Sequence, residues 1–218
     1  MMLKNFVISY SKKGFTLAEV LITLVIVGVV AALTIPTLVN NTKKNEYVAG
    51  LKKANSVLSQ AVYKIGMSKG YPVGDYSFFN DVDFAEEFSK TVNIAKKCNS
   101  FDECFLGPYK YLSGSNANIG TQKSVITSDG QMYNFVITSS DHVYGLSEED
   151  ANNVKWRIFA DINGQKGPNQ FGYDTFFFYL VDGKGIVPGG SYSSADCIKS
   201  STGVTCAGKI LRENAINY

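Results

Sequence analysis

The sequence predicts an α+β protein in which a long N-terminal helix packs on an antiparallel β-sheet. Three observations lead to this class. Residues 20–39 carry no charge, residues 43–65 hold an apolar stripe at helical spacing, and residues 123–187 contain short β-branched and aromatic segments separated by turns. The length of 218 residues suits one domain of ordinary size with an attached element.

The charge of the chain is unevenly distributed. Residues 1–14 contain three lysines and no acid, so they carry +3, and the formal total of +2 leaves −1 for the remainder. The hydrophobic content of 45% excludes disorder as the main state. The near-neutral remainder argues against a strongly basic nucleic-acid binder.

The uncharged run at residues 20–39 is long enough to cross a bilayer as a helix, about 30 Å at ~1.5 Å per residue. A secretory signal peptide is one alternative, but the run is too long and no Ala-x-Ala site follows it. A plain signal anchor is another. Neither alternative explains Glu19, the single charge in an apolar stretch that begins at Phe15. A carboxylate in lipid is costly unless it has a charged partner or a function there.

The residues around Glu19 resemble a known processing motif. Residues 12–22 read KKGFTLAEVLI, which resembles the prepilin cleavage and methylation motif of type IV pilins and type II secretion pseudopilins. The basic leader, Gly14 before the cut, Phe15 after it and Glu19 as the fifth residue of the processed chain all match. The resemblance is close over residues 9–66. Beyond them, only the layout of the chain is similar.

This resemblance implies cleavage between Gly14 and Phe15 by a membrane-embedded prepilin peptidase, followed by N-methylation of Phe15. It implies a pilin-like fold that spans the bacterial inner membrane once, with a cytoplasmic N-terminus and the soluble domain outside, assembled into a periplasmic or extracellular filament. The basic leader would hold the N-terminus in the cytoplasm. The expected division is a leader (1–14), a transmembrane and assembly helix (15–39), its amphipathic continuation (40–70) and a globular α+β domain (71–218).

Two residues of the helix are candidates for assembly. We expect the Phe15 amine of one subunit to neutralise Glu19 of its neighbour, because an unpaired carboxylate in a low-dielectric bundle is penalised. Pro36 removes a backbone hydrogen bond within the helical pattern. It predicts either an ordinary kink or, as the resemblance implies, a segment that melts on assembly.

Two helical stretches follow from periodicity. The first continues the apolar helix, with apolar residues on one face and lysines on others, and ends near Gly66 and Gly70. The second is predicted over residues 81–97, with Asp81 or Asp83 as N-cap.

Four or five strands should follow. Residues 123–127 and 131–139 flank a Ser-Asp-Gly turn and predict a hairpin. Residues 154–162 and 175–181 are rich in aromatic and β-branched side chains, and a glycine-containing turn leads from them to residues 186–187.

The four cysteines are Cys98, Cys104, Cys197 and Cys206, which allow three disulfide connectivities. An exported domain lies in an oxidising compartment, so we favour the local pairs Cys98–Cys104 and Cys197–Cys206. The second pair resembles the disulfide-bounded loop of many pilins. A zinc site is the alternative, although no CxxC occurs and the single histidine, His142, lacks a ligand spacing with the cysteines.

One loop could hold a metal ion. Asp161, Asn163, Gln165 and Asp174 offer the oxygen ligands that calcium prefers, and some secretion pseudopilins are similar in holding calcium in a late loop. The spacing is not that of an EF-hand. The alternative is a structural turn at Asn163-Gly164, in which Asp161 accepts backbone N–H bonds. Calcium is the one cofactor that the sequence suggests.

The function that these residues predict is structural. No catalytic set is present, since a hydrolytic triad would have to use His142 in a polar stretch between strands. We expect a filament subunit whose partners are other copies of itself, minor pilins or pseudopilins, prepilin peptidase and an inner-membrane assembly platform. Type IV pilus, secretion pseudopilus and DNA-contacting competence pilin are alternative roles, and the near-neutral charge disfavours the last. A non-polymerising, membrane-anchored periplasmic binding module is the alternative from another class.

Overall fold

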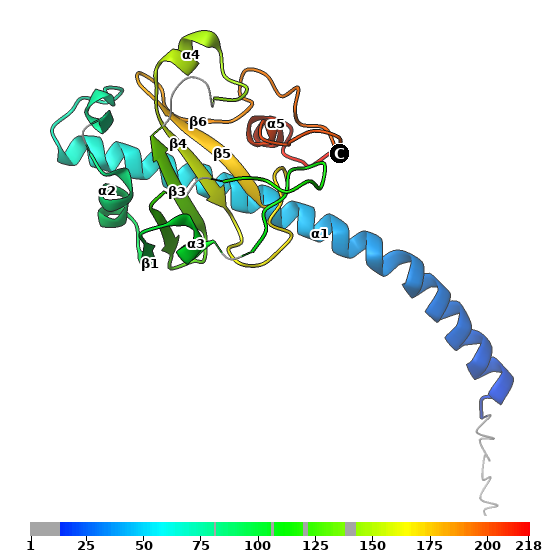
Figure 1. Ribbon diagram of the computed structural model, residues 1–218. Helices are drawn as coiled ribbons and strands as arrows, with labels where there is room; N and C mark the ends of the chain where they lie inside the picture. Colours follow the sequence, from blue (N-terminus) through cyan, green and yellow to red (C-terminus); the bar gives the residue numbers. More distant parts are fainter. Residues whose placement is uncertain (1–13, 81, 106, 120–121, 138–142) are drawn as a thin grey trace, which may run out of the picture. The chain divides into compact units, whose positions relative to one another are not determined.

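The computed structural model describes residues 14–80, 82–105, 107–119, 122–137 and 143–218 (Figure 1). The chain divides into two compact units, one up to Thr42 and one from Lys43 to Tyr218. The α+β class is confirmed: a long N-terminal helix is followed by a six-stranded antiparallel sheet.

The helical elements of the described chain are α1 (Leu17–Ser68), the 3-10 helix η1 (Ser77–Asn80), α2 (Phe84–Thr91), α3 (Phe101–Cys104), α4 (Glu148–Asn152) and α5 (Cys206–Glu213). The strands are β1 (Ile94–Cys98), β2 (Ser124–Thr127), β3 (Met132–Ile137), β4 (Val154–Asp161), β5 (Thr175–Val181) and β6 (Gly185–Pro188).

Helix α1 changes character along its length. Its most apolar 18-residue window has a mean hydropathy of 2.6 and no buried residue, so by length and composition this part can cross a membrane. The later part is amphipathic, and its apolar stripe is buried in the second unit. The buried residues of α1 are Val48, Leu51, Ala54, Leu58, Ala61, Val62, Ile65 and Gly66.

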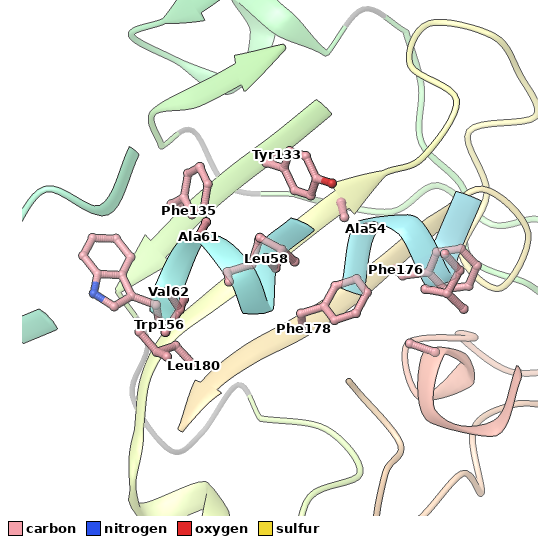
Figure 2. Close-up of a cluster of buried hydrophobic side chains, with 14 of the residues drawn as sticks. Ala54, Leu58, Ala61, Val62, Tyr133, Phe135, Trp156, Phe176, Phe178 and Leu180 are labelled. Carbon is pink, nitrogen blue, oxygen red and sulfur yellow. The ribbon is translucent and has the colours of Figure 1, made fainter. Parts of the chain in front are cut away.

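The sheet has the strand order β1-β2-β3-β4-β5-β6, and every neighbouring pair is antiparallel. One face packs on α1. Figure 2 shows Leu58 and Val62 of α1 among the aromatic side chains of the strands, which include Phe135 and Phe178. The predicted packing of the sheet on the long helix is therefore present.

The opposite face of the sheet has a second apolar cluster. Alternate residues of β4 and β5, such as Phe159, Phe177 and Tyr179, join side chains of α3 and of the loop around Tyr109. Because both faces are covered, all seven residues of β5 are buried. This strand therefore reads as a continuous apolar run instead of an alternating one.

The predicted hairpin is confirmed over the described residues. Strands β2 and β3 pair through Val125 and Tyr133, and Gly130 occupies the turn with φ of 90°. The predicted end of this hairpin at residues 138–139 lies outside the described residues.

The helix predicted over residues 81–97 is too long. Asp83 caps α2 by accepting the Glu86 N–H, as expected, whereas Asp81 lies outside the described residues. The helix ends at Thr91, and the next residue, Val92, is extended. Residues 94–98 then form β1, because their backbone pairs with β2. The sheet consequently has six strands instead of the predicted four or five.

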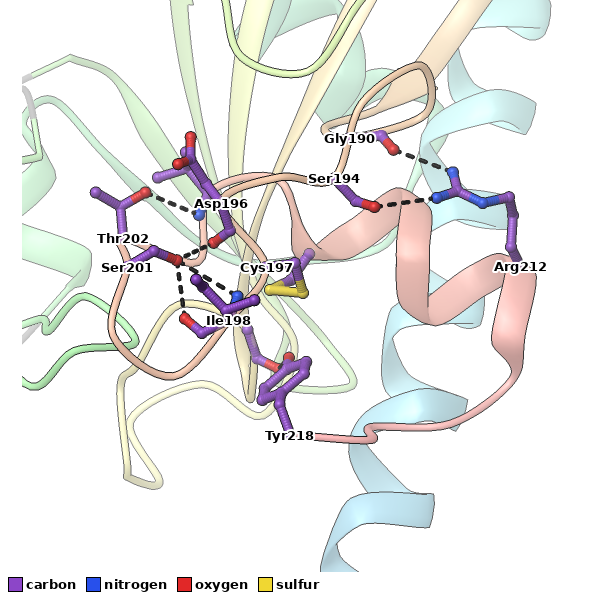
Figure 3. The surroundings of a disulfide bond; sticks show 12 residues. Gly190, Ser194, Asp196, Cys197, Ile198, Ser201, Thr202, Arg212 and Tyr218 are labelled. Carbon is purple, nitrogen blue, oxygen red and sulfur yellow. Dashed lines mark hydrogen bonds between the residues drawn. A yellow bond between two sulfur atoms is a disulfide. The ribbon is translucent and has the colours of Figure 1, made fainter.

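The C-terminal helix α5 was not predicted. Its inner face, with Ala207 and Ile210, joins the same apolar cluster as the amphipathic half of α1. Arg212 of α5 donates to the Gly190 carbonyl oxygen and to the Ser194 hydroxyl oxygen, and so ties the helix to the preceding loop (Figure 3).

Candidate processing and assembly site

The start of α1 is a capping box. The Thr16 hydroxyl accepts the Glu19 backbone N–H at 3.2 Å, and a Glu19 carboxylate oxygen accepts the Thr16 backbone N–H at 2.8 Å. The Thr16 hydroxyl also donates to that oxygen at 2.8 Å. This reciprocal arrangement satisfies N–H groups that the first turn of a helix otherwise leaves without partners. Glu19 therefore has a hydrogen-bonding partner within its own chain.

Sequence reasoning missed Thr16. The signal was present, because Thr-x-x-Glu before an apolar run is a recognisable helix start. The pairing leaves the net charge of Glu19 uncompensated, since threonine is neutral.

Gly14 and Phe15 precede this cap and are exposed. The Phe15 side chain is 89% exposed, and a Cβ placed on Gly14 would meet no atom within 4 Å. No contact among the described residues requires a glycine at position 14.

Pro36 lies inside α1, and the helix is continuous through it. The backbone is therefore helical on both sides of Pro36. Whether the surrounding segment opens during assembly stays a prediction.

The loop of residues 161–174 is built around two buried carboxylates. Asp161 accepts the Tyr109 hydroxyl at 2.8 Å and the Asn163 backbone N–H at 3.2 Å. Asp174 accepts the backbone N–H groups of Asn169 and Gln170 at 2.8 and 2.7 Å. Both carboxylates thus hold the turn through hydrogen bonds to their oxygens.

Burial controls the protonation of this pair. Desolvation, with the nearby charge of Asp174, raises the pKa of Asp161 to about 8. Desolvation also raises the pKa of Asp174 to about 6, against the lowering effect of its backbone hydrogen bonds. Both residues have no exposed surface.

The calcium ligands predicted from sequence are only partly brought together. Asn163 lies beside Asp174, to which its amide group donates at 3.3 Å, but Gln165 is exposed. The side-chain oxygens of Asn163 and Asn169 are buried without a hydrogen-bond donor among the described residues. These two amide oxygens are the feature that fits a cation site. The carboxylates already accept backbone N–H groups, which fits the structural turn. The hydrogen bonds favour the structural turn of the two alternatives, and a calcium titration is the test between them.

The four cysteines form two local disulfides, Cys98–Cys104 and Cys197–Cys206. These are the two pairs favoured from the sequence. The first closes the segment around α3, and the second ties α5 to the loop before it (Figure 3). His142 lies outside the described residues.

Comparison with known proteins gives one match. The family described as the prokaryotic N-terminal methylation motif matches residues 10–35. No curated protein and no solved structure matches the chain. The matched residues contain Gly14, Phe15, the capping box and the apolar run of α1 up to Ile35. The chain therefore carries, at residues 10–35, the N-terminal methylation motif that is the signature of type IV pilins and pseudopilins.

Proposed function

We propose that this chain is a structural subunit of a type IV pilus-like filament, either a type IV pilin or a type II secretion pseudopilin. Prepilin peptidase cleaves it between Gly14 and Phe15 and methylates the new amine of Phe15. The processed chain stays in the inner membrane through the apolar part of α1, with its soluble unit outside. An assembly platform then moves it into the filament.

The observation that carries this proposal is the exposed apolar surface of α1. Leu17 is 80% exposed, Leu33 is 73% exposed and Leu38 is 68% exposed. Such a surface is unfavourable in water and must be covered by lipid or by other helices. Cleavage at Gly14 removes the basic leader but leaves this surface on the working chain, unlike ordinary secretion, where the apolar segment is discarded.

Gly14 supports processing at this position. Nothing among the described residues requires a glycine there, so the fold itself gives no reason for it. A peptidase that binds the backbone in a narrow cleft would impose it, since glycine has no Cβ.

Glu19 supports assembly through charge pairing. Its hydrogen bonds to Thr16 stabilise the start of the helix but leave one negative charge in an apolar segment. The amine that cleavage creates on Phe15 of a neighbouring copy is the opposite charge that the motif itself provides. The pair would fix the register of neighbouring helices more than it would add net stability.

The experiment compares Glu19→Ala with Glu46→Ala, a change of an exposed acid in the same helix outside the apolar run. Filaments are sheared from cells and pelleted, and processing is followed by the mass of the membrane-extracted chain. Glu19→Ala should be processed yet lose at least tenfold in filament yield, whereas Glu46→Ala should assemble as wild type does. Equal filament yields for both variants would overturn the pairing.

The non-polymerising alternative, a membrane-anchored periplasmic binding module, makes the opposite predictions. It requires no cleavage at Gly14, and its location and amount tolerate the loss of Glu19. Within the filament reading, the partners are further copies of the chain and related minor pilins or pseudopilins. The gene neighbourhood would separate a pilus from a secretion or competence role.

A further inference from the structure

A cavity of about 390 Å³ lies on the face of the sheet that α1 does not cover. Arg157 of β4 and Phe177 of β5 contribute to it, and Phe177 belongs to the apolar cluster on that face. The other lining residues are Tyr144, Phe171 and residues of the loops around 111–119 and 196–204. The volume lies in the range of about 300–1,000 Å³ that is usual for small-molecule sites.

One wall of the cavity is aromatic and held in place by ring contacts. Phe171 and Phe177 are buried, with their ring centroids 4.9 Å apart. Tyr111 stacks on Phe171 at 5.7 Å, and Tyr144 stacks on Phe177 at 6.3 Å. Both tyrosines are only half-buried, so they offer ring surface to a ligand while the phenylalanines fix their orientation.

The rest of the lining is polar and contains both signs of charge. The Arg157 guanidinium lies 5.3 Å from the centroid of the Phe177 ring, a cation–π contact. The Asp196 side chain is exposed and makes no hydrogen bond or ion pair with the part of the chain that the structure describes. The Asn118 amide and the Thr202 hydroxyl add neutral donors and acceptors.

Hydrogen bonds and a disulfide hold the loop that presents Asp196 and Thr202 (Figure 3). The Asp196 carbonyl oxygen accepts the Gly203 backbone N–H at 3.0 Å, and the next residue, Cys197, is in a disulfide. The Leu112 backbone N–H donates to the Thr202 carbonyl oxygen at 3.0 Å, which links this loop to the segment carrying Tyr111. The polar groups and the aromatic wall are therefore positioned before any ligand binds.

We propose that this cavity binds a neutral saccharide of one or two rings. An anion would meet the Asp196 carboxylate, a cation would meet the Arg157 guanidinium, and a purely apolar ligand would remove the Asp196 charge from water without replacing its hydrogen bonds. A sugar avoids all three penalties. Its hydroxyl groups donate to Asp196 and accept from Arg157, and its C–H face packs on the tyrosine rings, whose faces are negative.

The test uses the full chain in a zwitterionic detergent without a sugar headgroup, because a glycoside detergent would compete. Glucose, galactose, N-acetylglucosamine, lactose and maltose are screened by saturation-transfer NMR, and binding is titrated. At least one sugar should bind saturably. Tyr144→Ala and Asp196→Asn should each weaken its binding at least tenfold. The Tyr144 backbone N–H bond to Tyr179 does not involve the substituted side chain, so the first variant keeps it.

The matched controls are Tyr192→Ala and Asp102→Asn, which change an exposed tyrosine and an exposed aspartate that do not line the cavity. Both should bind as wild type does, and unchanged fluorescence melting of Trp156 should show that all variants are folded. Saturable binding of none of the sugars would overturn the proposal. It would also be overturned by binding insensitive to the cavity variants, or by cavity-dependent binding of benzoate or benzylammonium in place of the sugars. The proposal does not depend on filament formation.

Discussion

The buried pair Asp161 and Asp174 predicts an unusual dependence of stability on pH. The folded state raises the pKa of Asp161 from its ordinary 3.8 to about 8, so at neutral pH the folded chain holds a proton that the unfolded chain releases. The free energy of unfolding therefore falls as pH rises, by about 1.4 kcal/mol per pH unit for this proton. The stabilisation from this proton is complete at pH values below the ordinary pKa of 3.8, and it is lost as the pH rises past the folded-state pKa of about 8.

The most informative interval runs from about pH 6 to about pH 7. The pKa of Asp174 is about 6, so Asp161 provides most of the effect of the pair there. Asp161→Asn mimics the protonated carboxyl group. Its amide oxygen can accept the Asn163 backbone N–H, and its amide nitrogen can donate to the Tyr109 hydroxyl. In the wild type, the free energy of unfolding should therefore fall with rising pH by about 1.4 kcal/mol per pH unit more than in this variant.

The assay is urea unfolding of the full chain in detergent, followed by tryptophan fluorescence. Trp156 is the single tryptophan of the sequence. It is 7% exposed, and its indole donates to the Phe79 carbonyl oxygen at 2.8 Å, so it reports on the soluble unit. Comparison of the variant with wild type subtracts the titration of His142, which both chains contain. Asp102→Asn is the control for an exposed carboxylate. Equal slopes for wild type and Asp161→Asn would refute the reasoning.

Three further changes test the fold and its loop. Leu58→Ala removes a side chain with no exposed surface from the contact between α1 and the sheet, and should cost about 3 kcal/mol in urea unfolding, whereas exposed Ser59→Ala should cost less than about 0.5 kcal/mol. Replacing both Cys197 and Cys206 by serine opens a loop with a sequence separation of 9 and should lower unfolding stability by about 2–4 kcal/mol; a loss within error would show that the bridge is dispensable. Millimolar calcium should leave the melting temperature unchanged, because protein donors already occupy the carboxylates of the 161–174 loop, and a rise of several degrees would establish the calcium alternative.

The long helix and the central strands could be predicted because each depends on a local pattern. Residues 20–39 are uncharged over a full bilayer length, and the stripe through Leu51 and Leu58 repeats at helical spacing. Strand β5 is an apolar run bounded by turn residues, and its predicted and observed bounds agree at Thr175–Val181.

The errors arise where a local pattern is weak or misleading. Ala95 continues the helical period of Phe84 and Phe88, yet it lies in β1, a short edge strand whose residues 95–97 are all exposed. Pairing with β2 decides its conformation, and that pairing joins segments about thirty residues apart. Periodicity along one segment does not contain this information.

The polar contacts divide in the same way. The capping of Glu19 by Thr16 could have been predicted, since it depends on a spacing of three residues. The contact between Tyr109 and Asp161 spans 52 residues and depends on the fold of the second apolar cluster. The sequence therefore predicted the loop, but it did not predict that Tyr109 donates a hydrogen bond to the buried Asp161 carboxylate.

The central claim is that this chain is processed as a prepilin, and one mass measurement tests it most directly. Intact-mass spectrometry of the chain extracted from membranes reads both steps at once. Processing as a prepilin predicts a mass that lacks residues 1–14 and carries one additional methyl group on Phe15. A chain that retains the bond between Gly14 and Phe15 would contradict it.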